Sequence, residues 1–140
     1  MSSVKLNKMI EKLQLVNLVP EVSTDEIEIS SPEINRPALQ LAGYFEHFAS
    51  ERVQIIGYVE YTYLKSLDRD VKLANYEQFL SSDIPCVIYS TRTEPDEDMI
   101  ELAKKYHKPL LSSHRITSDL MAEVIRWLGV ELAPCISIHG

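Results

Sequence analysis

The chain has 140 residues, of which 45% are hydrophobic and 25% charged, and its formal net charge at pH 7 is −7. This length suits one domain, and the composition is that of an ordinary globular protein. The acidic balance, without any basic run, argues against a nucleic-acid partner. No stretch approaches the roughly 18 apolar residues that a membrane span needs, and the first residues do not resemble a signal peptide, so we expect no membrane contact and a cytoplasmic location.

The first half of the chain predicts short elements at irregular intervals. A first helix, capped by Ser2 or Ser3, is predicted from the apolar residues that share one of its faces: Leu6, Met9, Ile10 and Leu13. An apolar run follows at 15–19, and the alternating pattern at 26–29 is typical of a half-exposed strand. A strand is predicted at 52–57, and then a helical region from about 61 to 79 with a candidate break near 68–70.

The second half of the chain is more regular. The nearly continuous apolar run at 84–89 indicates a strand covered on both faces. A helix follows Glu94-Pro95, with acidic residues in its first turn and lysines in its last, as the helix dipole favours. A strand at 109–112, a helix at about 119–129 capped by Thr117 or Ser118, and a strand at 135–138 complete the order. This alternation predicts a single α/β domain, a layered sheet with parallel strands and helices on both faces.

Motifs that carry chemistry are scarce in the sequence. There is no glycine-rich phosphate loop, and no pair of cysteines or histidines at metal-ligand spacing. An independent enzyme would have to use Cys86 or Cys135 as a nucleophile. Both cysteines sit in apolar runs, where the thiolate is disfavoured and a reduced, buried thiol of a cytosolic protein is expected. The chain by itself is therefore not expected to be an enzyme.

Two loops deserve a functional interpretation because each follows a predicted parallel strand. They are residues 90–93 and 112–118. Loops at the carboxyl ends of parallel strands form the ligand crevice of open sheets. Arg92 or Arg115, with hydroxyls such as that of Ser113, would suit a phosphate or a carboxylate. The simpler alternative, which we favour, is that these residues cap helices and solvate loops.

Two segments in the middle of the chain carry a family resemblance. They read NRPALQLAGYF at 35–45 and ERVQIIG at 51–57, and they resemble the N-terminal domain of HPr kinase/phosphorylase, whose pattern is close to R-P-G-L-x-L-A-G-Y-F and E-R-[IV]-Q-[ILV]-[LI]-G. Smaller matches at 85–88, 94–95, 103–109 and 132–140 extend the resemblance over nearly the whole chain. Ala38 and His107 depart from the pattern, since the family usually has glycine at both positions.

The resemblance implies that residues 1–134 are a non-catalytic N-terminal domain and that 135–140 begin the strand leading into a catalytic domain. Enzymes of this family phosphorylate a serine of the phosphocarrier protein HPr with ATP or pyrophosphate and Mg²⁺, and reverse the reaction by phosphorolysis, which controls carbon catabolite repression. They are typically hexamers assembled mainly through the catalytic domain. His139 matches the active-site histidine of the I-H-G motif, so we expect a catalytic role for it in the parent only. The fragment itself is expected to hold no cofactor and to be a monomer or a weak dimer.

A second resemblance lies at the level of fold. The chain resembles the N-terminal domains of the Mur ligases, and its second half resembles the DRTGG domain, which occurs beside ligand-sensing modules. This leaves an alternative function open: a stand-alone sensor of a nucleotide or a phosphorylated metabolite.

Overall fold

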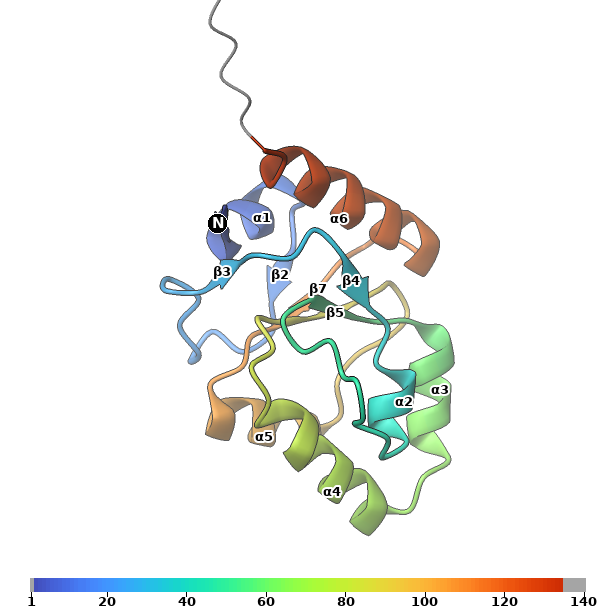
Figure 1. Ribbon diagram of the computed structural model, residues 1–140. Coiled ribbons are helices and arrows are strands. Elements are labelled where there is room, and N and C mark those ends of the chain that lie inside the picture. Colours follow the sequence, from blue (N-terminus) through green and yellow to red (C-terminus); the bar gives the residue numbers. More distant parts are fainter. Residues whose placement is uncertain (1, 135–140) are drawn as a thin grey trace, which may run out of the picture.

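The computed structural model describes residues 2–134 of the chain (Figure 1). The strand predicted at 135–138, together with Cys135 and His139, lies outside the described residues. In the described part, no helix is both long enough and apolar enough to cross a bilayer.

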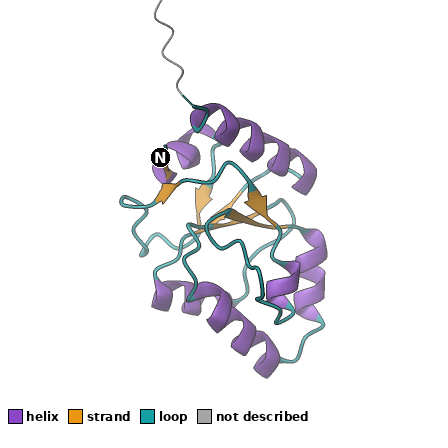
Figure 2. Cartoon of the chain, viewed as in Figure 1, coloured by secondary structure: helices purple, strands orange, loops and turns teal. Residues whose placement is uncertain are grey.

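The centre of the molecule is a five-stranded sheet with the order β2-β7-β6-β5-β4. Four of its strands are parallel: β4 (Ile34–Asn35), β5 (Val53–Ile56), β6 (Val87–Tyr89) and β7 (Leu110–Ser112). The edge strand β2 (Val16–Asn17) runs antiparallel to β7, with Val16 opposite Ser112. A separate antiparallel pair joins β1 (Val4–Lys5) to β3 (Glu28–Ile29). Figure 2 shows these strands as a thin layer between the helices.

Helices cover both faces of the sheet (Figure 1). On one face lie α2 (Ala38–Leu41), α3 (Tyr58–Lys65), α4 (Arg69–Leu80) and α5 (Glu97–Tyr106), and on the other lie α1 (Leu6–Lys12) and α6 (Thr117–Glu131). The predicted α/β class, with parallel strands and helices on both faces, is therefore confirmed.

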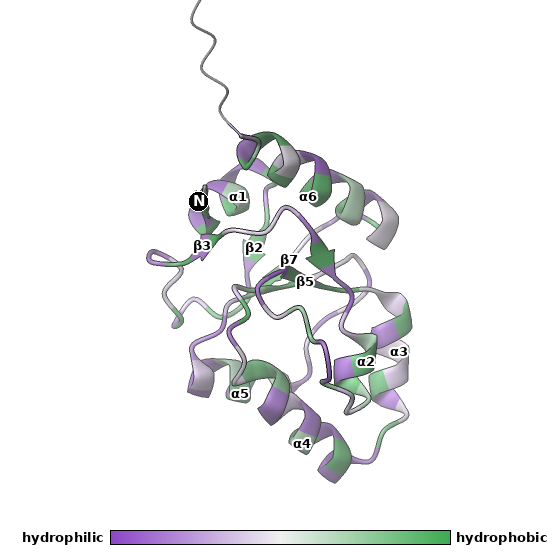
Figure 3. Cartoon of the chain, viewed as in Figure 1, coloured by the Kyte–Doolittle hydropathy of each residue, from purple (hydrophilic) through white to green (hydrophobic). Residues whose placement is uncertain are grey.

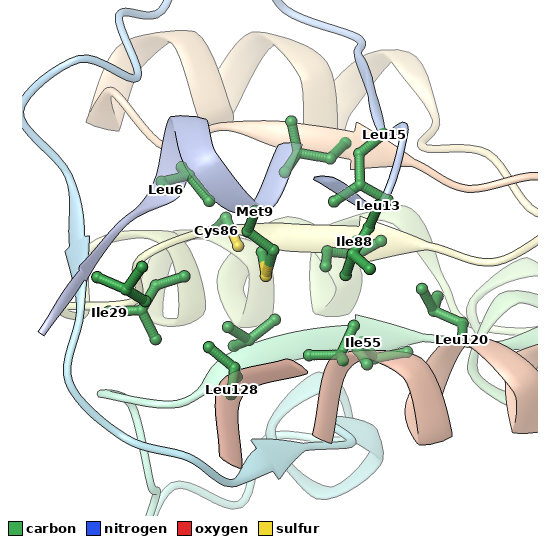
Figure 4. Close-up of a cluster of buried hydrophobic side chains, with 14 of the residues drawn as sticks. Leu6, Met9, Leu13, Leu15, Ile29, Ile55, Cys86, Ile88, Leu120 and Leu128 are labelled. Carbon is green, nitrogen blue, oxygen red and sulfur yellow. The ribbon is translucent and has the colours of Figure 1, made fainter. Parts of the chain in front are cut away.

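The alternation of side chains along the central strands divides the core in two. Ile55 and Ile88 point into a cluster with residues of α1 and α6 (Figure 4). Their neighbours Val87 and Tyr89 point the other way, into a cluster with α4 and α5. Successive residues of a strand face opposite sides of a sheet, so a strand buried on both sides is apolar at most positions. Figure 3 shows the outer helices with mixed hydrophilic and hydrophobic colouring, since each buries only one side.

The predicted helix starts need three corrections. α1 follows directly on β1 and has Lys5 at its N-cap with no side-chain cap, so the predicted cap by Ser2 or Ser3 is wrong. α6 begins at Thr117 with Ile116 at the N-cap, so the cap predicted at Thr117 or Ser118 is also wrong, because the Thr117 hydroxyl pairs with Ser90 at 2.8 Å. The break predicted near 68–70 is confirmed, but the helix before it begins three residues earlier, at Tyr58.

Both ends of α5 carry capping residues. Asp96 caps its N-terminus by accepting a hydrogen bond from the Met99 amide at 2.8 Å. Its C-cap is His107 in the left-handed conformation, with φ of 56°. A residue in this conformation commonly ends a helix, and glycine adopts it with least strain. Glycine at this position, which the resemblance pattern has, would adopt the left-handed conformation without strain. In this chain His107 adopts it instead.

Candidate functional site

The carboxyl ends of the parallel strands meet at one edge of the sheet. The residues that follow these strands are Arg36 after β4, Gly57 after β5, Ser90 after β6 and Ser113 after β7. In an open parallel sheet this is the edge where ligands bind, so it is the candidate functional site.

One corner of this edge is filled by a charged pair. The guanidinium of Arg36 donates two hydrogen bonds to Glu60 of α3, from Nε to Oε2 and from Nη2 to Oε1, each at 2.6 Å. The Glu60 side chain is only 1% exposed, whereas that of Arg36 is 31% exposed. Oε1 of Glu60 also accepts the Gly57 amide at 3.2 Å. A bidentate fork of this kind holds two elements in one geometry, so the pair fixes the end of β4 to the start of α3.

The same corner requires glycine at position 57. A Cβ atom there would lie 2.7 Å from the Thr117 side chain and 2.8 Å from Nη2 of Arg36. Gly57 is therefore the point where the first turns of α3 and α6 and the end of β4 come together. No open crevice remains at this point, because protein side chains occupy it.

A buried polar network continues from this corner along the resemblance segments. Asn35 donates to Gln54 at 2.7 Å and to Gln40 at 3.2 Å. Gln54 then donates to the carbonyls of Ala49 and Arg52, at 3.3 and 2.8 Å. Buried polar groups need such partners, and here the partners hold the irregular loop between α2 and β5. These residues therefore shape the backbone around the corner.

Arg115 and Ser113 face the opposite side of the sheet. Nη1 of Arg115 donates to the carbonyl of Leu13 at 2.7 Å and lies 3.4 Å from the Ser113 hydroxyl. Leu13 is the C-cap of α1, so the guanidinium completes the end of that helix, where a cation is favourable. The cavity beside Arg115 is lined by α6 residues such as Trp127. These contacts suit the simpler interpretation, in which both residues have structural roles.

Arg92 lies in a different place from Arg115, although their loops are joined where the Thr91 amide donates to the Arg115 carbonyl at 2.8 Å. Arg92 is exposed and adopts a left-handed φ of 65°. It lines an open cavity of about 310 Å³ together with Tyr58, Thr91, Ile116 and Thr117. The structure thus separates the two arginines that the sequence analysis had grouped, and only Arg92 faces this cavity.

The described residues also include one cysteine and side chains of the types that bind metals. Burial raises the pKa of the Cys86 thiol to about 12, so the nucleophilic thiolate is strongly disfavoured. Within residues 2–134, no cluster of histidine, cysteine or acidic side chains has the arrangement of a metal site.

The Arg36–Glu60 pair is the feature that sequence reasoning missed. Two signals pointed to it. Glu60 stands three residues after Gly57, the spacing of a residue that reaches back to the start of its helix, and Arg36 is the second residue of the first resemblance segment. Nothing in the linear order shows that these two residues meet.

Comparison with known proteins finds a matching family model and several similar curated proteins. The family model described as "HPr Serine kinase N terminus" matches residues 4–128. HPr kinase/phosphorylase of Lachnoclostridium phytofermentans is 46% identical over all 140 residues, and that of Alkaliphilus metalliredigens is 39% identical over the same length. The chain covers 45% of each of these two relatives, so it spans about half the length of the curated relatives it matches.

A solved structure with a similar fold belongs to a different protein. It holds the CBS and DRTGG domains of the regulatory region of Clostridium perfringens pyrophosphatase, in complex with the activator diadenosine tetraphosphate. The TM-score is 0.54 at 15% identity, and the match covers 94% of this chain and 48% of that one. At this identity the likeness is one of fold alone.

Proposed function

The chain belongs to the HPr serine kinase N-terminal family, and from this membership we propose that it is the non-catalytic N-terminal domain of an HPr kinase/phosphorylase. The observation that carries the proposal is the match to the family model over 4–128, combined with coverage of only 45% of the relatives. The absence of a glycine-rich phosphate loop from the sequence supports it, since phosphoryl transfer from ATP depends on such a loop, a lysine and Mg²⁺.

The activity of the whole enzyme follows as part of the proposal. It phosphorylates a serine of HPr with ATP or pyrophosphate and Mg²⁺, and removes the phosphate by phosphorolysis, in the cytoplasm and in the control of carbohydrate use. It assembles as a hexamer, mainly through the catalytic domain. In that enzyme His139 stands at the active site, and residues 135–140 join the two domains.

Within the enzyme, the domain acts as a rigid unit for assembly or partner contact. The support for this role is the closed corner at Arg36 and Glu60, which ties β4, α3 and α6 into one body. The stand-alone sensor is less well supported as a function, because its fold-level relative is 15% identical whereas the kinase relatives reach 46%.

The test is a comparison of the 140-residue chain with the enzyme purified from its host. Intact mass spectrometry of the natural protein should give about twice the 16.0 kDa of this chain. The chain alone, incubated with HPr, ATP and Mg²⁺, should yield no phosphoserine, whereas the natural enzyme should yield it under the same conditions. Phosphotransfer by the chain alone, or a natural mass of 16 kDa, would contradict the proposal.

A further inference from the structure

A shallow groove runs along the loop that follows β6, on the side facing α3. Three open cavities make it up, and they share lining residues. The cavity at Tyr58 and Arg92 adjoins one lined by Tyr61, Arg92, Thr93 and Glu94, which adjoins a third that extends to Lys65 and Tyr76. Because they share Arg92 and Tyr61, these hollows are adjacent, and together they are called the groove below.

The wall of the groove on α3 is aromatic. The rings of Tyr58 and Tyr61 have centroids 6.2 Å apart with their planes inclined at 41°. Tyr58 is 58% exposed, and Ile116 across the cavity is 56% exposed. Large apolar side chains exposed side by side in a concave surface are uncommon without a partner. The wall offers ring faces on which a planar group can stack.

Two cations flank these rings and have no carboxylate partner among the described residues. Nζ of Lys65 lies 4.3 Å from the centre of the Tyr61 ring, and Arg92 lies at the junction of two of the cavities. Eight of the 14 lysines and arginines, by contrast, form ion pairs: Lys8, Arg36, Arg52, Arg69, Lys72, Lys104, Lys105 and Arg126. In a chain with a net charge of −7, two cations without acidic partners beside exposed rings suit an anion that also carries a planar group.

At the far end of the groove, the carboxylate of Asp96 already has partners within the protein. Asp96 accepts hydrogen bonds from the Tyr76 hydroxyl at 2.8 Å and from the Met99 amide, and pairs with Lys72 at 2.9 Å. Burial and the nearby Asp96 raise the pKa of Tyr76, so its hydroxyl stays protonated and keeps donating. Glu94 is exposed on the rim, where its carboxylate can accept hydrogen bonds from the amino group of a base. Asp96 is therefore neutralised within the protein, whereas Glu94 shares a cavity with Arg92 and leaves the end at Tyr58 without a lining carboxylate among the described residues.

We propose that this groove binds a nucleoside phosphate, with the base against Tyr58 and Tyr61 and the phosphate beside Arg92. The ring faces supply stacking, which tolerates different bases, and the guanidinium supplies a charge-assisted contact to phosphate oxygens. This site goes beyond the proposed function, because it does not involve the phosphoryl-transfer centre. It adds a regulatory input to a domain that otherwise has only a mechanical role.

The experiment is isothermal titration calorimetry of the 140-residue chain with AMP, and with adenosine and inorganic phosphate as the two halves of the ligand. Since this chain has no phosphate loop, the catalytic nucleotide site does not interfere, and the outcome is independent of the kinase assay above. AMP should bind with a sub-millimolar dissociation constant, and each half should bind more weakly than AMP. No AMP binding at millimolar concentration overturns the proposal, as does phosphate binding as tight as AMP binding.

Matched variants locate the site. Arg92→Gln and Tyr58→Leu should each weaken AMP binding about tenfold, because they remove the cation or the stacking surface. Tyr63→Leu and Lys5→Gln are the controls: Tyr63 is an exposed tyrosine of α3 outside these cavities, and Lys5 is an exposed lysine of β1. The controls should bind AMP as the unmodified chain does. Equal weakening by Lys5→Gln and Arg92→Gln would mean a non-specific charge effect and would overturn the assignment.

Discussion

Arg36 and Arg92 follow two strands of the same sheet edge, β4 and β6, with β5 between them, yet their surroundings differ. Arg36 makes a two-pronged contact with a buried carboxylate and packs against Gly57. Arg92 is exposed in an open cavity, and no carboxylate pairs with it among the described residues. The edge that usually receives ligands is thus closed at one corner and open at another. The difference shows that a buried carboxylate near an arginine ties its side chain to the fold, whereas Arg92 has no such partner among the described residues and lines an open cavity.

The closed corner explains what the resemblance segments do physically. Arg36 belongs to the first segment and Gly57 to the second, and the two meet beside Glu60. Asn35, Gln40 and Gln54, from the same segments, form a buried network that holds the loop before β5. The residues of the two resemblance segments therefore serve mainly to hold the fold together. The following predictions test that difference between the two corners.

The largest expected effect is the loss of Arg36. Arg36→Met leaves the buried Glu60 carboxylate without its charged partner and should lower the free energy of unfolding by about 3 kcal/mol. Urea denaturation followed by circular dichroism measures the loss. The double variant Arg36→Met/Glu60→Leu removes both charges and should recover most of the stability. A double variant as unstable as the sum of the two single changes would mean that charge pairing is not the cause.

Gly57→Ala should have the next largest effect. The added methyl group meets Thr117 and Arg36 at less than 3 Å, and overpacking of this kind lowers the free energy of unfolding by about 2 kcal/mol. Gly129→Ala in α6 is the matched control, since nothing lies within 4 Å of its added carbon. That control should raise stability by up to about 1 kcal/mol, because alanine favours the helix. Thermal denaturation measures the stability of both variants. If their melting temperatures shift in the same direction, the close packing at Gly57 is contradicted.

Asp96→Ala tests the far end of the groove, where Asp96 contacts Tyr76. It removes the N-cap of α5 and the acceptor of the Tyr76 hydroxyl, so we expect a loss of about 1 to 2 kcal/mol. Asp96→Asn retains an acceptor for the Met99 amide and should lose less. Chemical denaturation of both variants gives the order. An asparagine variant as unstable as the alanine variant would assign the effect to charge and not to the cap.

The smallest effect on stability is expected at the open corner. Arg92→Gln removes an exposed cation without a carboxylate partner, and surface changes of this type stay within about 0.5 kcal/mol. Glutamine is also no worse than arginine at the left-handed φ of this position. The midpoint of urea denaturation should therefore be unchanged. A loss above 1 kcal/mol would show that Arg92 supports the fold, in the way that Arg36 does.

The family and most of the elements could be predicted because their signals are local. The apolar run at 84–89 and the charge pattern of α5 depend on neighbours a few residues away, as do the motifs at 35–45 and 51–57. Arg115 and Ser113 were grouped with Arg92 because all three follow parallel strands. The two loops do meet, through the Thr91 amide and the Arg115 carbonyl, but the Arg115 side chain contacts the end of α1 whereas Arg92 lines the cavity with Tyr58.

The sequence by itself determined the α/β class, the family and three of the four parallel strands, β5, β6 and β7, since hydrophobic periodicity and contiguous motifs lie within short stretches of chain. The short strand β4 was not predicted, because its two residues carry no periodic pattern. Only the tertiary structure decided which arginine pairs with a buried carboxylate and which stays exposed without one. Arg36 meets a carboxylate 24 residues away, and Arg115 reaches a carbonyl 102 residues away. Such contacts are set by how the strands are ordered and how the helices pack on them. No local pattern encodes a partner at that separation.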